Sequence, residues 1–203
     1  MYNQKGFTLI EFIVVVSIIV VIAGTIIPVY FSMKPTIRVN GAARQLMGDL
    51  MWARMRAVSE NNDYVIAFGE AGPDLSNDTY YIYDDDNGDF ITLGTATTGK
   101  LVKTTIIPDR YDDIGYGYVA GINKTDNLTP LLGNPVTFAS GGGTKPIWFR
   151  FRPNGISNIP GAIYLISNED LANNKTERMR AITISIAGRV KIWNYNSGTS
   201  AWE

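Results

Sequence analysis

The longest pattern in the sequence is an apolar run from Phe12 to Met33 that contains no charged side chain. As a helix, about 22 residues would rise roughly 33 Å, enough to cross a hydrocarbon core of about 30 Å. A buried helix of a soluble protein is the weaker interpretation, because a soluble domain rarely covers every face of a helix. A cleaved secretory signal would show a shorter apolar core and a small-x-small cleavage site, which the run lacks. The pattern therefore predicts a membrane-inserted helix.

The apolar pattern changes after Pro35 to steps of four and three residues. One stripe is formed by Val39, Ala43, Leu46, Leu50, Ala53 and Ala57. Such a stripe predicts an amphipathic helix that packs against a sheet, and Arg38, Asp49 and Arg56 fall off it. The polar segment Ser59 to Asp63 contains asparagines that favour a helix C-terminus, so we expect the helix to end there.

The rest of the chain consists of short segments rich in β-branched and aromatic residues, separated by Gly, Pro, Asn and Asp. The expected strands are Tyr64–Phe68, Thr79–Tyr83, Phe90–Leu93, Leu101–Ile107, Ile147–Phe151, Ile163–Ile166, Ala181–Ile186 and Arg189–Tyr195. No second long helix and no repeat is visible. The predicted fold class is α+β, with a long N-terminal helical spine, half membrane and half amphipathic, packed on a mainly antiparallel β domain.

Composition excludes several chemistries. The 203 residues include no histidine and no cysteine, which removes Ser-His-Asp triads, thiolate nucleophiles, imidazole metal ligands and disulfides. No spacing of Asp, Ser and Lys assembles a nucleophile with a base, so an anchored enzyme is disfavoured, and no catalytic, cofactor or metal site is expected. The net charge of -1 hides segregation, because residues 61–145 hold 12 acidic and 5 basic side chains whereas residues 146–203 hold 4 and 7.

Two residues disturb a simple membrane anchor. Glu11 lies one turn inside the apolar stretch, where an unpaired carboxylate costs on the order of 2 to 4 kcal/mol, so a partner is implied. Pro28 removes a backbone hydrogen bond and favours a kink or a locally melted turn. Charge counting leaves the orientation open, because Lys5 precedes the run and Lys34 and Arg38 follow it.

The segment Lys5-Gly6-Phe7-Thr8-Leu9-Ile10-Glu11, followed by the apolar run and Pro28, resembles the class III signal of type IV pilins and type II secretion pseudopilins. The resemblance implies cleavage after Gly6 by a prepilin peptidase and N-methylation at Phe7. It also implies that Glu11 pairs with the terminal amine of a neighbouring subunit, that an inner-membrane assembly platform takes part, and that the bulk of the chain lies outside the cytoplasm. The expected organisation is a leader over residues 1–6, a transmembrane and filament-core helix over 7–33, an amphipathic helix over 34–62 and a pilin-like β domain over 63–203.

Three further segments resemble the minor pseudopilins of the GspH/FimT type. They are Leu50–Ala57 followed by Asn61-Asn62, Phe149–Gly155, and Ile182–Ser185 with Gly188–Lys191. Together the resemblances cover about half of the chain. Residues from about Asp109 to Lys145 match no family pattern and are expected to be a loop-rich insertion. The chain departs from many type IV pilins by lacking the cysteines of their C-terminal loop, which favours the pseudopilin branch.

Two pairs of basic residues, Arg150/Arg152 and Arg189/Lys191, have the i, i+2 spacing that places both side chains on one sheet face. If the strands are neighbours, they form a basic strip able to contact DNA phosphates. The segment Gly188–Lys191 is similar to a glycine-arginine hairpin of some FimT-like proteins of DNA uptake. The alternatives are a solvated strand face or a surface that meets the acidic middle of an adjacent subunit.

The segment Asp84–Asp89 places five oxygen-bearing side chains in six positions, which hard cations such as calcium favour. It departs from the EF-hand order, and Asn87-Gly88 is a strong hairpin signal, so a plain acidic turn between Tyr80–Tyr83 and Phe90–Leu93 is the preferred interpretation.

The sequence and the resemblance together predict a minor structural subunit of a type IV pilus-like or type II secretion fibre. A DNA-binding minor pilin of a competence pilus is the alternative.

Overall fold

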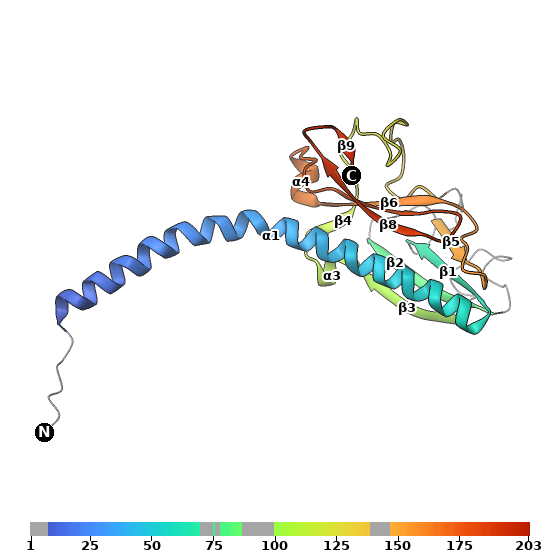
Figure 1. The fold of residues 1–203 in the computed structure, drawn as a ribbon, viewed down its shortest axis with the longest axis horizontal. Coiled ribbons are helices and arrows are strands. Elements are labelled where there is room, and N and C mark those ends of the chain that lie inside the picture. The colour runs from blue at the N-terminus through green and yellow to red at the C-terminus, as the bar shows by residue number, and fades with distance from the viewer. Residues whose placement is uncertain (1–7, 70–74, 76–77, 87–99, 139–146) are drawn as a thin grey trace, which may run out of the picture. The chain divides into compact units, whose positions relative to one another are not determined.

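The computed structural model describes residues 8–69, 75, 78–86, 100–138 and 147–203 (Figure 1). The chain divides into two compact units, Met1–Ile37 and Arg38–Glu203. The first unit holds the N-terminal part of a long helix, and the second holds the C-terminal part of that helix with two sheets. The fold class is α+β, as predicted.

The long helix α1 runs from Leu9 to Glu60 without a break in its helical assignment. Of the two alternatives predicted at Pro28, a kink or a locally melted turn, the melted turn is wrong, since the backbone stays helical on both sides of it. The C-terminal end follows the expected asparagines. Asn61 adopts the left-handed conformation with φ of 56°, and the N–H of Asn62 donates to the carbonyl oxygen of Ala57 at 3.2 Å, which terminates the helix.

The first sheet has four antiparallel strands in the order β3-β2-β1-β5. Their bounds are β1 Asp63–Phe68, β2 Thr79–Asp85, β3 Lys100–Ile106 and β5 Ile147–Phe151. Because β2 pairs with β1 along one edge and with β3 along the other, the hairpin expected between Tyr80–Tyr83 and Phe90–Leu93 is wrong. The segment Phe90–Leu93 itself lies outside the described residues.

The second sheet has five strands in the order β4-β6-β7-β8-β9. Their bounds are β4 Ile114–Tyr116, β6 Gly161–Ser167, β7 Arg180–Ile184, β8 Val190–Asn196 and β9 Ala201–Trp202, and two short helices, α3 Ile107–Arg110 and α4 Asn168–Ala172, precede β4 and follow β6. Ile107, expected to end a strand, begins α3, where Pro108 suits the first turn. All pairings among these five strands are antiparallel.

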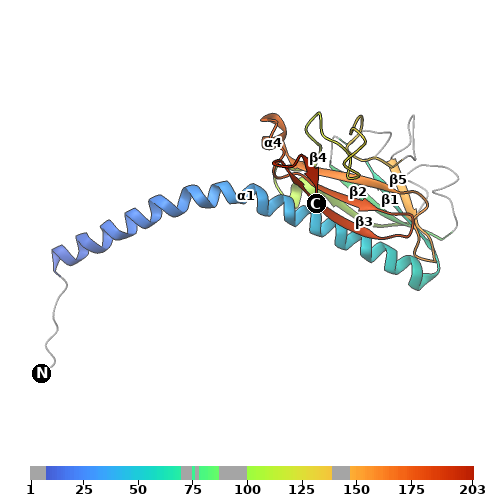
Figure 2. The same ribbon diagram turned by 45° about the horizontal axis from the view of Figure 1, so that its top comes forward.

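The main core lies where the amphipathic part of α1 meets both sheets (Figures 1 and 2). All six residues of the predicted stripe are at most 1% exposed. They pack with aromatic and aliphatic side chains of both sheets, among them Tyr64, Phe68, Phe149, Ile163 and Ile182. The stripe prediction is confirmed, and it explains why this half of α1 is ordered against the strands rather than free in solvent.

Asp49 lies at the border of the stripe and also faces the first sheet. Its carboxylate accepts a hydrogen bond from the Tyr80 hydroxyl at 2.6 Å and forms an ion pair with Lys103 at 2.6 Å, with 14% of its side chain exposed. Helical spacing could place Asp49 beside the stripe but could not show that β2 and β3 supply a phenol and an ammonium group there. The contact fixes α1 against these two strands.

The region expected to be a loop-rich insertion carries part of the core. Val119, Ile122 and Leu131 pack with Tyr164 and Trp202 on the outer face of the second sheet, in a second cluster of buried side chains. Val136 forms an isolated bridge with Ile163 of β6 and joins the main core. The described part of this region, up to residue 138, therefore covers the second sheet.

Candidate functional site

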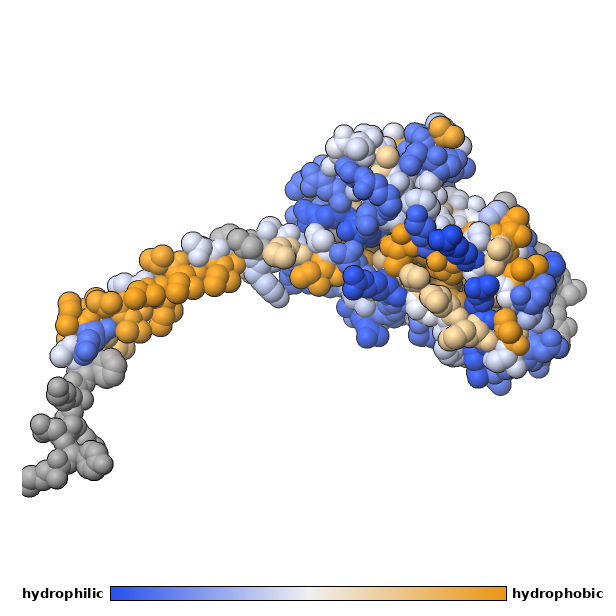
Figure 3. All heavy atoms as spheres, viewed as in Figure 1, coloured by the Kyte–Doolittle hydropathy of each residue, from blue (hydrophilic) through white to orange (hydrophobic). Residues whose placement is uncertain are grey.

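The N-terminal part of α1 carries the strongest functional signal. Residues Leu9–Ile27 form a span with a mean hydropathy of 2.9, and none of it is buried. Isoleucine and valine side chains such as Ile19 and Val21 are 59% and 68% exposed, and Figure 3 shows apolar atoms along the visible side of this span. Exposed apolar surface of this extent is stable in a hydrocarbon environment or when covered by other protein.

The polar groups within the span are bonded inside the helix. The Ser17 hydroxyl donates to the carbonyl oxygen of Ile13 at 2.8 Å, and the Thr25 hydroxyl donates to that of Ile22 at 2.9 Å. A hydroxyl that bonds its own helix needs no partner from lipid. The span is thus compatible with a membrane along its length, apart from Glu11.

Glu11 is held at the start of α1 by Thr8. Both the backbone N–H and the hydroxyl of Thr8 donate to Oε2 of Glu11 at 2.8 Å, and the N–H of Glu11 lies 3.4 Å from the Thr8 hydroxyl oxygen. This is a capping box, in which Thr8 is the N-cap and Glu11 the third helical residue. The carboxylate therefore has a partner within its own chain. The pattern Thr-x-x-Glu before an apolar run could have predicted Thr8 from the sequence.

The other processing and assembly residues are only partly visible. Gly6 and Phe7 lie outside the described residues, and Pro28 is described by its helical backbone alone. Their roles in cleavage, methylation and assembly stay predictions. Because α1 begins at Leu9, two residues after Phe7, the expected cleavage point falls just ahead of the helix.

The predicted basic strip does not lie on one sheet. Arg150 is on β5 of the first sheet, whereas Lys191 is on β8 of the second, so the strands are not neighbours. The guanidinium group of Arg150 is 2.6 Å from Asp63 in an ion pair with about a fifth of each side chain exposed. Its charge is compensated within the chain, whereas Arg152, in the turn after β5, is exposed.

Arg189 and Lys191 differ in their surroundings. Arg189 is exposed in the turn before β8. The Lys191 ammonium nitrogen lies 3.2 Å from the centroid of the Trp193 ring, a cation–π contact on the face opposite the main core. The turns that carry Arg152 and Arg189 are joined, because the N–H of Ser157 donates to the carbonyl oxygen of Ile186 at 2.9 Å. The structure thus brings two exposed arginine-bearing turns together.

Arg54 of α1 holds these two turns and was missed by sequence reasoning. Its Nε donates to the carbonyl oxygen of Gly155 at 2.8 Å and its Nη2 to that of Ala187 at 3.2 Å. The spacing of the helix stripe indicates only that Arg54 follows a buried alanine. Which carbonyl groups it reaches depends on the tertiary arrangement, so no sequence signal could have identified them.

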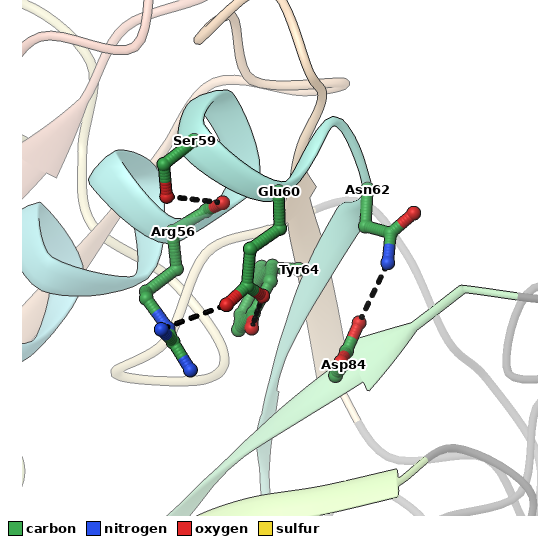
Figure 4. A network of polar contacts seen from close by, with 6 residues as sticks. All are labelled: Arg56, Ser59, Glu60, Asn62, Tyr64 and Asp84. Atoms are coloured by element: carbon green, nitrogen blue, oxygen red, sulfur yellow. Dashed lines mark hydrogen bonds and ion pairs between the residues drawn. The ribbon is translucent and has the colours of Figure 1, made fainter.

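The acidic segment begins at the end of β2. Asp84 accepts a hydrogen bond from Nδ2 of Asn62 at 3.3 Å, beside a network in which Arg56 pairs with Glu60 at 2.7 Å and the Tyr64 hydroxyl donates to Glu60 (Figure 4). Burial and the Glu60 carboxylate raise the pKa of Tyr64 to about 12. Residues 87–89 lie outside the described part, and no group of three acidic side chains is placed to hold a metal within the described ranges. The calcium interpretation stays a prediction.

A hollow of about 540 Å³ on the second sheet has the size of a ligand pocket. Its lining includes Lys124, Asp126, Tyr164 and Trp193. Hydrogen bonds from the Thr129 hydroxyl and from the backbone N–H groups of Thr129 and Leu128 lower the pKa of Asp126 to about 2. Such a carboxylate is a weak general base, because efficient bases have a pKa near the working pH.

Comparisons with known proteins point to the N-terminal segment. Residues 1–27 match the sequence profile described as "Prokaryotic N-terminal methylation motif". The chain matches no curated protein by sequence. Several solved structures are similar to it, including the following two. The type IV minor pilin FimU of Pseudomonas aeruginosa PAO1 has 16% identity and a TM-score of 0.43, over 75% of this chain and 90% of that chain. The minor pseudopilin EpsH of the Type 2 Secretion System of Vibrio cholerae has 10% identity and a TM-score of 0.43, over 77% and 97%.

The match to the methylation motif covers the same residues on which the resemblance to prepilins rests, and it confirms that resemblance. The motif is followed by an exposed apolar helix and by a unit of antiparallel sheets. Residues 1–27 therefore carry the prokaryotic N-terminal methylation motif, the segment on which the resemblance to type IV pilins and pseudopilins rests.

Proposed function

We propose that this chain is a non-enzymatic minor subunit of a type IV pilus-like or type II secretion fibre. A prepilin peptidase cleaves after Gly6, Phe7 is methylated, and the apolar part of α1 holds the subunit in the inner membrane with Arg38–Glu203 outside the cytoplasm. With the help of an inner-membrane assembly platform, the helix then moves into the fibre among other pilin-like subunits.

The observation that carries the proposal is the match of residues 1–27 to the methylation motif. The exposed apolar span Leu9–Ile27 supports it, because the same surface suits lipid before assembly and neighbouring helices afterwards. The Thr8–Glu11 capping box keeps the carboxylate at the start of α1, next to the expected new N-terminus at Phe7. During assembly the Glu11 carboxylate exchanges Thr8 for the terminal amine of a neighbouring subunit.

The docking role is tested with Glu11→Ala in the full chain. We expect the variant to insert in the membrane and to be cleaved, but to be lost from the sheared fibre fraction. Thr8→Ala removes the capping hydroxyl while it keeps the carboxylate, so it should still enter fibres. Ser17→Ala is the control for a change within the span. Equal amounts of Glu11→Ala and wild-type chain in fibres would contradict the docking role, and an uncleaved wild-type chain would contradict the proposed function as a whole.

A second candidate function, DNA binding in a competence pilus, is favoured by the two joined turns with exposed Arg152 and Arg189. Contacts of several cations with phosphates give an affinity that falls with salt and is independent of sequence. Gel-shift titration of the wild-type chain against Arg189→Ala/Lys191→Ala tests it. Reduced binding by the double variant supports a phosphate site, whereas unchanged or salt-independent binding contradicts it. Arg150→Ala is a poor probe, because it leaves Asp63 without its ion-pair partner.

A further inference from the structure

A small cleft lies between α1 and β8 within the second unit. Asn40, Ala43 and Arg44 of α1 form one wall, and Ile192 and Asn194 of β8 form the other, around about 260 Å³. The cleft thus has room for the end of one side chain or for a small ion. Its lining contains a guanidinium group and two amides but no carboxylate, so its electrostatic potential favours an anion.

Arg180 adds a second positive charge next to this cleft, because it contacts Asn40 on one wall and is paired with Asn194 on the other. It is the first residue of β7, lies opposite Asn194 in the register with β8, and is only 8% exposed. Its Nε donates to Oδ1 of Asn40 at 2.7 Å, and its Nη1 donates to the carbonyl oxygen of Met179 at 2.8 Å. Both acceptors are neutral. Burial lowers the pKa of Arg180, as expected for a cation with little compensation.

A buried cation without an anionic partner is unusual, because burial of an unpaired charge is strongly unfavourable. The neighbouring arginine Arg178 shows the ordinary solution, since it pairs with buried Asp170 at 3.3 Å. Within the described part of the chain, neither Arg180 nor Arg44 forms an ion pair. For buried Arg180, whose two acceptors are neutral, an anion from outside the chain would offset part of the cost of burial, and exposed Arg44 is free to bind the same anion.

The hydrogen-bonding groups at the cleft specify the chemistry of that anion. Because Oδ1 of Asn40 accepts from Arg180, the side-chain group of Asn40 that can bind another partner is its amide nitrogen, which is a hydrogen-bond donor. Arg44 is exposed and adds a planar guanidinium group, which matches the two oxygens of a carboxylate. The donors around the cleft thus fit one oxyanion of carboxylate size.

We propose that this cleft binds a carboxylate side chain of a neighbouring fibre subunit. The inference rests on the proposed function, and the charge distribution supports it. The walls of the cleft come from residues 7–60 and 146–203 of the cleaved chain, whose side chains are net positive by two and three charges, whereas those of residues 61–145 are net negative by seven. Subunits with this distribution attract one another when the acidic middle of one subunit meets the cleft of the next.

Charge reversal in the full chain tests the cleft. Arg44→Glu should reduce the amount of the chain in the fibre fraction about tenfold, because it places a carboxylate next to the carboxylate of the neighbouring subunit. Arg44→Lys keeps the positive charge and should keep most of the chain in the fibre fraction. Lys175→Glu, which makes the same charge change at an exposed position outside the cleft, is the matched control. If the wild-type chain enters fibres and Arg44→Glu enters them equally well, the cleft proposal is wrong while the proposed function stands.

A photo-crosslinking residue at Asn194 identifies the occupant. We expect a crosslinked subunit peptide that contains Asp or Glu, and changing that acid to Arg should restore fibre entry of Arg44→Glu. A crosslink to DNA, to a neutral peptide or to no partner at all would overturn the proposal.

Arg180→Met separates binding from structure. Replacing a buried charge by an apolar side chain should leave the melting temperature of the detergent-solubilised chain unchanged or raise it, while fibre entry falls. A lower melting temperature together with normal entry of Arg44→Glu would instead assign Arg180 a purely structural role.

Discussion

Gly188 is a residue whose identity is set by space as well as by backbone conformation. Its φ is 73°, in the left-handed region, and a Cβ built on it would lie 2.1 Å from the carbonyl oxygen of Gly155. The glycine therefore permits the turn before β8 to touch the turn after β5. The glycine-arginine turn singled out in the sequence is thus attached to the protein rather than extended into solvent.

We expect Gly188→Ala to lower the free energy of unfolding by roughly 3 kcal/mol. About 1 kcal/mol comes from the left-handed conformation and about 2 kcal/mol from displacement of packed backbone. Gly121→Ala is a matched control, because Gly121 has φ of 88° but no atom within 4 Å of its Cβ position. Denaturant unfolding of both variants measures the difference. Equal losses would show that conformation alone makes Gly188 necessary.

The pKa of Asp78 is raised, because the effect of burial on this carboxyl group is larger than the opposite effect of its hydrogen bond. Its Oδ1 accepts this bond from the N–H of Tyr116 at 2.5 Å. Between its unfolded pKa of about 3.9 and the higher folded value, the folded state binds more protons than the unfolded state. Stability contributed by this group therefore falls as the pH rises through that interval, and the loss is complete above it.

Asp78→Asn should make the protein more stable at pH 7, because the amide oxygen keeps the hydrogen bond with Tyr116 while the half-buried charge is removed. The advantage over the wild type should grow from pH 4 upward. Thermal unfolding of the full chain in detergent between pH 4 and 8 measures it. A variant that is less stable than the wild type at pH 7 would show that the carboxylate, as a charge, is needed.

At the scale of elements, α1 is fixed to both sheets by polar as well as apolar contacts. Arg54→Gln shortens the side chain that joins α1 to Gly155 and Ala187, so we expect a loss of about 1 to 3 kcal/mol in unfolding free energy. Arg56→Gln, which removes an i, i+4 ion pair with Glu60 and a cation–π contact with Trp52 on the helix surface, should cost about 1 kcal/mol or less. Denaturant unfolding compares the two, and equal losses would contradict the clamping role of Arg54.

The elements show which features could be predicted from the sequence. The stripe from Val39 to Ala57 was predictable because helical spacing is a local property of the chain. The partner of β2 was not, since Asn87-Gly88 favours a local hairpin, whereas the structure pairs β2 with β3 across a longer segment. Pairing over a longer loop depends on packing of the whole sheet, which local turn propensity does not encode.

In the candidate site, too, local contacts could be predicted from the sequence and long-range contacts could not. The Thr8–Glu11 contact is local and follows from the Thr-x-x-Glu pattern. The contacts around the cleft join Asn40 and Arg44 to residues more than 100 positions further along the chain, and sequence spacing does not predict contacts over such a separation. The burial of Arg180 among neutral groups emerges only when α1 lies across β7 and β8.

At the scale of the whole molecule, the described buried apolar side chains lie between Val39 and Trp202. The unit Arg38–Glu203 therefore contains its own core, and the span Leu9–Ile27 adds no buried surface to it.

We expect a chain that begins at Pro35, one turn ahead of Val39, to be water-soluble and folded, because this unit has its own core and because proline suits the first turn of a helix. Its melting temperature should lie within roughly 3 °C of that of the full chain in detergent. The full chain should stay in the membrane during carbonate extraction. A shortened chain that aggregates or lacks a cooperative unfolding transition would show that the N-terminal span is needed for folding as well as for anchoring.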